Sequence, residues 1–379
     1  MGDKMKKSII YFLAAFLILF CVGFSKAEKD VVKSLPKVMV IQSYAPNQAG
    51  GTLMEPGFFK KLKEMGYEDG KNIQIYEFYM DTITTYKTPE QIEERAQYTL
   101  NEIKKFDPKV VVIFDDTAFS KVGLKLVNTK YQVVYGGVNI KPEIYDKKVH
   151  FMNTREKPGF NVTGVTEEAP IDKSVKLLKK IVPSAKTIAF ISSNGGTFWE
   201  TIANQDAKDM MDNPQDYALK IVDFQMVDNF EQYKKLILEY NKRDDVDAIY
   251  NYGLTQLKTS DTNSEDIDQK VVAEWILKNQ KKPEAVWLMD WVEWGFLCGS
   301  GIDLPMNGKQ VAEKLVRILN GEKAGDISID KPKDFYMSIN LARAESLGIK
   351  VPYPILSLAK KVYTEMTCYP EYQYKGKMK

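Results

Sequence analysis

Histidine is almost absent from this chain, because His150 is the only one among 379 residues. A metal site with several histidine ligands is therefore excluded, and His150 is one weak candidate for a general base. The chain also lacks the Gly-x-Ser-x-Gly motif of serine hydrolases and the Walker A phosphate loop. Gly299-Ser300-Gly301 lacks the third glycine of a dinucleotide fingerprint. We therefore expect no catalytic residue, no metal and no cofactor, and predict that the chain is not an enzyme.

A strong excess of either charge is also missing, since 53 basic residues accompany 51 acidic ones. Removal of residues 1–27 would take away four lysines and one aspartate, which leaves 49 basic and 50 acidic residues. This balance gives no indication of binding to nucleic acid or to an anionic membrane surface.

The one long hydrophobic run extends from Ile9 to Phe24. Three lysines precede it and Ser25-Lys26-Ala27 follows, which is the pattern of a signal peptide cleaved after Ala27. An uncleaved anchor is one alternative. A lipoprotein anchored through Cys21 is another, but Phe20 is too bulky for the usual lipobox. We expect a periplasmic or otherwise extracytoplasmic protein.

Cysteine is scarce as well, and Cys298 and Cys368 are the two that would remain after cleavage. Export makes a disulfide chemically possible. Because the two are 70 residues apart and no further pattern supports pairing, both a disulfide and two isolated thiols remain open.

What the sequence does contain is an alternation of apolar runs and amphipathic helices. Val38–Ile41 and Val110–Phe114 are apolar runs typical of buried parallel strands. Thr88-Pro89 has the form of a helix N-cap followed by proline at the first helical position. The series predicts an α/β fold with mostly parallel sheets covered by helices. A second series of the same plan begins at Pro170, after an extended crossover over Pro158–Val165.

Several segments resemble the ABC transporter substrate-binding family related to tryptophan-binding components. The similarity covers roughly residues 36–365. The segments that carry it are Gly137-Val138-Asn139, Asn161–Val165, Pro170–Ser174, Leu177–Lys186, Ile318–Gly321 and Leu347–Pro352.

The resemblance implies a type I periplasmic-binding-protein fold, with two Rossmann-like lobes and three interlobe crossovers. Lobe 1 is expected over residues 37–157 plus about 291–325. Lobe 2 is expected over residues 158–290 plus about 326–365, and residues 366–379 form a C-terminal tail. The chain departs from the commoner family pattern at Asp115-Asp116, where many members have a small-residue turn.

Candidate ligand-binding residues follow or end the predicted strands, because ligands of open α/β sheets bind at the carboxyl ends of strands. Carboxylates suit an ammonium or hydroxyl group, aromatic rings suit flat ligands, and amides and hydroxyls fix orientation. The alternatives are helix capping, turn chemistry and core packing. The candidates are Ser43, Tyr44, Asp115, Asp116, Thr117, Asn139, Ser193, Asn194, Trp199, Tyr250, Asn251, Asp290 and Trp291.

These observations favour an extracytoplasmic solute-binding protein of an ABC transport system. The ligand is expected to be a small organic molecule, amino-acid-like or aromatic, bound between the lobes by lobe closure. The expected partner is an ABC permease in the inner membrane, and we expect a monomer. The alternatives are a ligand sensor that delivers to a sensor kinase or chemoreceptor, and an enzyme of the periplasm built on this fold.

Overall fold

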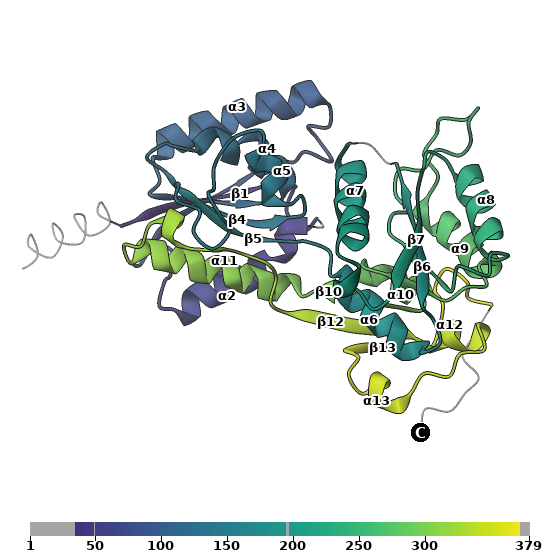
Figure 1. Ribbon diagram of the computed structural model, residues 1–379. Coiled ribbons are helices and arrows are strands. Elements are labelled where there is room, and N and C mark those ends of the chain that lie inside the picture. Colours follow the sequence, from purple (N-terminus) through teal and green to yellow (C-terminus); the bar gives the residue numbers. More distant parts are fainter. Residues whose placement is uncertain (1–34, 49, 195–196, 372–379) are drawn as a thin grey trace, which may run out of the picture. The chain divides into compact units, whose positions relative to one another are not determined.

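A computed structural model describes residues 35–48, 50–194 and 197–371. The chain forms two compact units, each with a sheet and covering helices (Figure 1). Unit 1 comprises the residues up to Gly136, Phe151–Gly164 and Gly308–Ile329, and unit 2 comprises Gly137–His150, Val165–Asn307 and Asp330 onward. The predicted signal peptide (1–27) and the end of the predicted tail (372–379) lie outside the described residues.

Unit 1 is built on a six-stranded sheet of order β11-β5-β4-β3-β1-β2. β1 pairs in parallel with β2 and β3, and β3 pairs in parallel with β4. The strands are β1 (Lys37–Gln42), β2 (Gln74–Tyr79), β3 (Val110–Phe114), β4 (Gln132–Val138), β5 (Val162–Thr166) and β11 (Ile329–Asp330). β4, β5 and β11 each contain a boundary between the units. The chain therefore passes from one unit to the other within each of these three strands.

The longest helix of unit 1 begins where the sequence predicts. Thr88 caps it: its side chain accepts a hydrogen bond from Gln91 N, and Pro89 is the first helical residue. The helical segments are η1 (Gly50–Leu53), α2 (Glu55–Glu64), α3 (Pro89–Phe106), α4 (Asp116–Lys121), η2 (Gly123–Leu126), α11 (Leu304–Leu319) and η4 (Ala324–Asp326).

Unit 2 is built on a seven-stranded sheet of order β13-β12-β10-β9-β8-β6-β7. All neighbouring pairs are parallel except β10 with β12. The strands are β6 (Thr187–Ser193), β7 (Lys220–Val227), β8 (Ala248–Asn251), β9 (Glu284–Val286), β10 (Cys298–Ile302), β12 (Phe335–Asn340) and β13 (Lys361–Tyr363). The predicted fold class, two mostly parallel sheets with interleaved helices, is confirmed.

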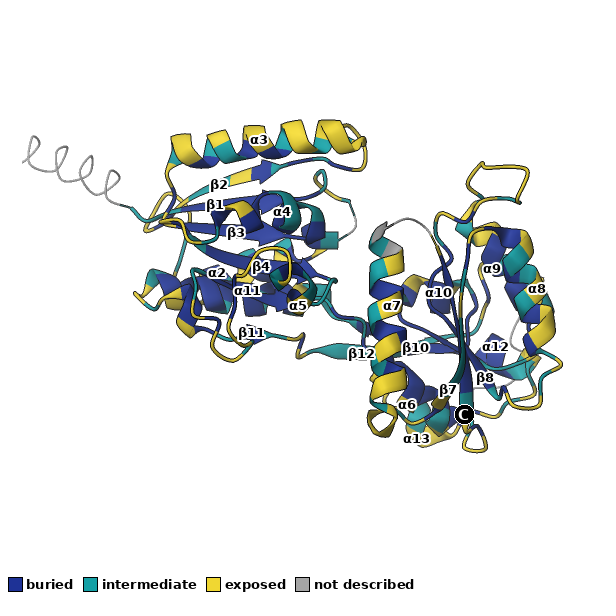
Figure 2. Ribbon diagram, turned by 45° about the horizontal axis from the view of Figure 1, so that its top comes forward, coloured by how far each residue is buried: buried dark blue, intermediate teal, exposed yellow. Residues whose placement is uncertain are grey.

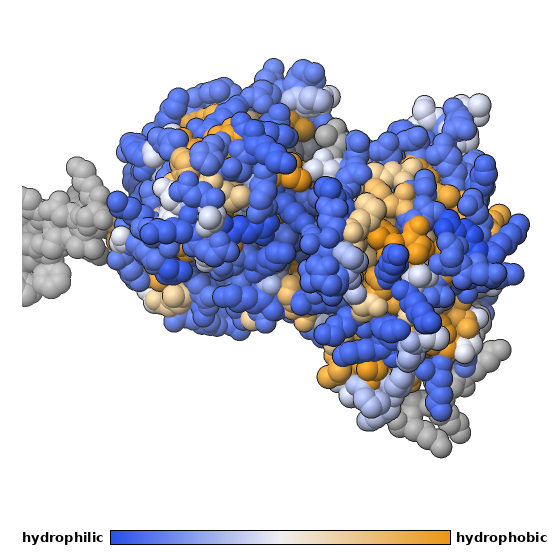
Figure 3. Space-filling view, in the orientation of Figure 1, coloured by the Kyte–Doolittle hydropathy of each residue, from blue (hydrophilic) through white to orange (hydrophobic). Residues whose placement is uncertain are grey.

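The helices of unit 2 supply the apolar faces that cover this sheet. They are α5 (Pro142–Asp146), α6 (Ile171–Ile181), α7 (Thr197–Asp212), η3 (Pro214–Asp216), α8 (Phe230–Tyr240), α9 (Gln269–Asn279), α10 (Met289–Trp294), α12 (Leu341–Ser346) and α13 (Tyr353–Leu356). Figure 2 shows the strands mostly in the dark blue of buried residues and the outer faces of the helices in yellow. The face drawn in Figure 3 is largely hydrophilic, with hydrophobic residues in patches.

The return to the first lobe occurs later in the chain than the resemblance implied. A return near Trp291 was expected, but Met289–Trp294 is a helix of unit 2 and β10 pairs with β9 and β12 of the same unit. The chain re-enters unit 1 at Gly308, inside α11. The reason is that Cys298–Ile302 adds a strand beside β9 in the sheet of unit 2 before the chain leaves that unit.

Gly164, in the predicted crossover, is explained by close packing. It lies in β5, and a Cβ atom built there would stand 2.4 Å from Cγ of Tyr135 in β4. Only glycine leaves room for that ring.

No helix among the described residues is both long and apolar enough to span a bilayer.

Candidate functional site

The carboxyl end of the unit 1 sheet brings together five predicted residues, which follow β1 and β3. Ser43 follows β1 and Asp115 follows β3, and these strands are parallel neighbours. The Ser43 hydroxyl donates to Phe114 O at 3.0 Å and accepts from Ala118 N at 2.8 Å. Ser43 is fully buried, and the two hydrogen bonds of its hydroxyl tie the end of β1 to the end of β3 and to the start of α4.

Asp115 is an acceptor for three donors. Gly51 N donates to Oδ2 at 2.8 Å, while Tyr44 OH and Asp116 N donate to Oδ1, each at 3.2 Å. Its backbone has φ of +79°, a region that non-glycine residues rarely adopt. Burial and the neighbouring Asp116 raise the pKa of Asp115 to about 7, against the lowering effect of the three donors. The carboxylate therefore holds η1 and Tyr44 at this edge.

The remaining unit 1 candidates lie beside this carboxylate. Asp116 is the first residue of α4 and is buried, with 5% of its surface exposed. Thr117 follows it and is half-buried, as is Tyr44. This edge of unit 1 therefore carries a phenol just after β1, and two carboxyl groups and a threonine hydroxyl just after β3.

Three candidates of unit 2 follow or end strands. Asn139 belongs to unit 2 but follows β4 of the unit 1 sheet, and its carbonyl accepts from Gln205 Nε2 at 3.1 Å, which attaches it to α7. Ser193 ends β6 and is fully buried, and its hydroxyl has no hydrogen-bond partner among the described residues. Asn194 is exposed, and its amide donates to Asp228 Oδ1 at 2.9 Å.

Tyr250 and Asn251 are in β8 but lie in the interior of unit 2. The Tyr250 ring stacks on Phe190 with centroids 5.3 Å apart. Asn251 accepts from Tyr233 OH at 2.8 Å and donates to Gln280 Oε1 at 3.3 Å. Both are completely buried, so each has a packing or hydrogen-bonding role that strand position alone did not reveal.

The sequence suggested that Asp290 and Trp291 end or directly follow a strand, but the structure places neither residue there. β9 ends at Val286, and both residues lie in α10. Asp290 is exposed, whereas Trp291 is buried and packs against Trp294 and Phe296. Trp199 lies in α7, and its side chain is outside the described part of the structure.

Sequence reasoning missed Asp206 and Trp287. Asp206 is 5% exposed on α7 and accepts from Tyr252 OH at 2.7 Å. The ring of Trp287 stacks on that of Tyr252, with centroids 5.5 Å apart. The sequence could have indicated Asp206, because this acidic residue lies four residues from both Ile202 and Met210, in the middle of an apolar helical stripe.

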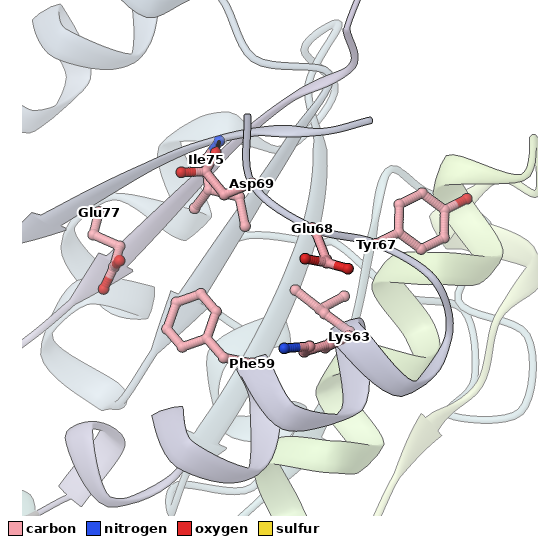
Figure 4. A pocket seen from close by; sticks show the side chains of 8 residues that line it. Phe59, Lys63, Tyr67, Glu68, Asp69, Ile75 and Glu77 are labelled. Atoms are coloured by element: carbon pink, nitrogen blue, oxygen red, sulfur yellow. Dashed lines mark hydrogen bonds between the residues drawn. The ribbon is translucent and has the colours of Figure 1, made fainter. Parts of the chain in front are cut away.

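A hollow of about 300 Å³ lies on unit 1 between α2, the loop after it and β2 (Figure 4). Phe59, Leu62 and Ile75 supply apolar surface, while Glu68 and Glu77 are among the acidic residues that line it. None of the predicted site residues lines this hollow. It lies beside the first half of β2, away from the carboxyl end of the sheet.

The structure also shows the surroundings of the two cysteines and of the histidine. Cys298 is buried in the core, Cys368 is half-buried, and both are free thiols. His150 is exposed and lies 3.1 Å from Asp146 Oδ2. Across residues 35–48, 50–194 and 197–371, no group of three or more His, Cys, Asp or Glu is arranged to hold a metal ion.

The chain forms two parallel-dominated α/β units, and proteins with open sheets of this kind bind small ligands at the carboxyl ends of the strands. Residues 48–363 match the family model described as ABC transporter substrate binding protein. The match covers most of the chain, which therefore belongs to this family of non-catalytic proteins that bind small ligands and work with an ABC permease.

Individual relatives agree with this assignment. A tyrosine-binding protein of Clostridioides difficile (strain R20291) is 24% identical over 296 residues, 78% of this chain and 76% of the relative. Among solved structures, a ligand-free, open substrate binding protein with adhesive properties from Clostridium difficile has a TM-score of 0.65 at 19% identity. A protein from Streptococcus pneumonia in complex with L-Trp has a TM-score of 0.61 at 20% identity. The comparisons with these two solved structures each cover 87% of this chain and 100% of the solved chain.

Proposed function

We propose that this chain is an exported substrate-binding protein that delivers an aromatic amino acid or a close analogue to an ABC permease, and that it acts as a monomer. The observation that carries the ligand class is an aromatic stack in unit 2, which runs from the middle of β6 to the residues that directly follow β8 and β9. Phe190 stacks on Tyr252, with centroids 5.0 Å apart, and Tyr252 stacks on Trp287 at 5.5 Å. Trp287 follows β9 and keeps 8% of its surface exposed.

This stack suits the recognition of a flat ring. Offset aromatic pairs contribute about 0.5 to 1.5 kcal/mol beyond the area that they bury. Trp287 is held in place because its Nε1 donates to Tyr252 O at 3.0 Å, so the ring is oriented before any ligand arrives. The tyrosine-binding relative and the L-Trp complex support the same ligand class. The expectation of lobe closure stays a prediction.

Trp287→Leu is expected to weaken the binding of L-tyrosine and L-tryptophan about tenfold, because the aliphatic side chain removes the ring face. Isothermal titration calorimetry on protein stripped of ligand by unfolding and refolding measures this. Trp275→Leu is the matched control, since Trp275 is a half-buried tryptophan of α9 that packs on Phe230. Equal losses in both variants would contradict a ligand role for Trp287.

The native ligand is the more direct test of the whole proposal. Protein purified without refolding is denatured, and the released small molecules are identified by mass spectrometry. An aromatic amino acid or analogue is the expected product. A sugar or an inorganic ion would overturn the proposed ligand class, and the absence of binding to any small molecule would overturn the proposed function.

Export through residues 1–27 has its own test. The intact mass of the protein isolated after secretion is expected to correspond to a chain that begins at Glu28, because cleavage follows Ala27. A mass that includes Met1 would support an uncleaved anchor. A lipid-modified chain that begins at Cys21 would support a lipoprotein.

A further inference from the structure

Asp206 occupies a position on α7 that is otherwise apolar. Ile202, Ala203, Ala207 and Met210 of the same helix are all buried in the main hydrophobic cluster of unit 2. Asp206 lies among them with 5% of its surface exposed. It is in the middle of a helix of 16 residues, so it caps neither end. A carboxylate at such a position costs folding free energy unless another interaction offsets the cost.

The structure supplies only part of that compensation. Tyr252 OH donates to Asp206 Oδ2 at 2.7 Å. Among the described residues, no second hydrogen bond and no ion pair within 4.0 Å involves Asp206. Lys141 is nearby, but its ammonium lies 3.7 Å from Asp209 Oδ1 instead. A carboxylate can accept about four hydrogen bonds, so most of the capacity of Asp206 is unused.

One carboxylate oxygen of Asp206 has no hydrogen bond among the described residues, and the residue keeps 5% of its surface exposed. Tyr252 directly follows β8, and Trp287 directly follows β9, the parallel neighbour of β8. The carboxylate is therefore joined by one hydrogen bond to the aromatic stack at the carboxyl ends of these strands, where ligands of such sheets bind.

We propose that Asp206 is the residue that receives the ammonium group of an amine-bearing aromatic ligand, whose ring lies against Trp287. This inference rests on the proposed function and makes it more specific, because it assigns one functional group of the ligand to one carboxylate. The ammonium would satisfy the open oxygen and neutralise a buried charge. By contrast, the three donors already bound to Asp115 give that carboxylate a structural role.

The protonation of Asp206 gives the assignment a second readout. Burial raises the pKa of Asp206 to about 7, with smaller raising effects from Glu168 and Asp209 and lowering effects from Tyr252 and Lys141. An ammonium binds the ionised carboxylate best. The affinity of the protein for an amine ligand is therefore expected to fall as the pH drops below 7, and Asp206→Asn removes this dependence.

The decisive experiment compares each ligand with its analogue that lacks the amine. L-tyrosine is titrated beside 3-(4-hydroxyphenyl)propanoate, and L-tryptophan beside 3-(indol-3-yl)propanoate, into wild type and Asp206→Asn. Wild type is expected to prefer the amine of one pair by about 10- to 100-fold, the range for a hydrogen bond to a charged group. Asp206→Asn is expected to lose that preference. Asparagine keeps an acceptor for Tyr252 OH, so the variant should fold.

Asp212→Asn is the matched control, because Asp212 is at the end of the same helix, is exposed and pairs with Lys208. It removes the same charge and should keep the preference of wild type. If Asp206→Asn also keeps it, or if wild type binds both members of each pair equally, Asp206 does not receive the ammonium. The inference is overturned but the proposed function stands if the native ligand has no amine. If wild type binds no small molecule, both fail.

Discussion

Arg343→Met is expected to lower the free energy of unfolding of unit 2 by about 3 to 5 kcal/mol, the usual cost of leaving a buried charge without its partner. Arg343 and Glu284 are 2% and 0% exposed. Two hydrogen bonds join them, from Nε to Oε1 at 2.9 Å and from Nη2 to Oε2 at 3.0 Å. Losing the guanidinium leaves Glu284 charged in the core.

The same guanidinium also connects three elements. It donates to Leu277 O at 2.9 Å and to Gln280 O at 3.1 Å, both at the end of α9. Glu284 in turn accepts from Leu297 N, just before β10, at 2.9 Å. The pair thus joins α12 to α9 and β9, and its loss leaves carbonyl groups unsatisfied as well.

Tryptophan fluorescence during urea unfolding measures this effect in unit 2 alone. All five tryptophans of the chain lie between residues 199 and 294, within unit 2. Lys278→Met is the control, since Lys278 pairs with Glu274 at the surface of unit 2 and exposed pairs add little to stability. A loss below about 1 kcal/mol in Arg343→Met would show that the buried ion pair adds little to the stability of unit 2.

The second expectation concerns pH. Relative to Asp206→Asn, wild-type unit 2 is expected to lose roughly 2 kcal/mol of unfolding free energy between pH 5 and pH 7.5. The folded-state pKa of Asp206 is raised from 3.8 to about 7. Between those values the folded state holds a proton that the unfolded state has released. Stability therefore falls as the pH rises, and the loss is complete once the pH exceeds the folded-state pKa.

Other polar and charged groups near Asp206 also influence its pKa and therefore the measured pH dependence. Lys141, Glu168, Asp209 and the Tyr252 hydroxyl all act on it. Comparison with Asp206→Asn removes effects common to both proteins. Urea unfolding of ligand-free protein at a series of pH values, followed by tryptophan fluorescence, gives the two curves. Parallel curves would show that Asp206 is ionised in the folded state throughout this range.

Much of the fold could be predicted from the sequence because its signals are local. The run Val110–Phe114 is apolar at every position, and it forms the fully buried β3. Thr88-Pro89 predicted a helix start that α3 adopts with its capping box. Strand and helix periodicity depend on neighbours a few residues away, which the sequence displays directly.

The position of the boundary after β9 could not be read in the same way. Ala285–Leu288 is apolar, and the following Trp291 is apolar too, so a strand that continues and a strand that ends before a helix give similar patterns. Tertiary context selected the helix: Trp291 packs against Phe296 in the core of unit 2, and Cys298–Ile302 then fills the place between β9 and β12.

The sequence by itself determined the α/β class, the two-lobed plan, the family and the strand ends at which Ser43, Asn139 and Asp115 lie. Only the tertiary structure decided which polar groups are already occupied. Asp115 accepts from Tyr44 and Gly51, more than 60 residues away, whereas among the described residues the one hydrogen-bond donor to Asp206 is the Tyr252 hydroxyl. The physical reason is that a carboxylate's partners are set by which elements pack together, and spacing along the chain does not encode that.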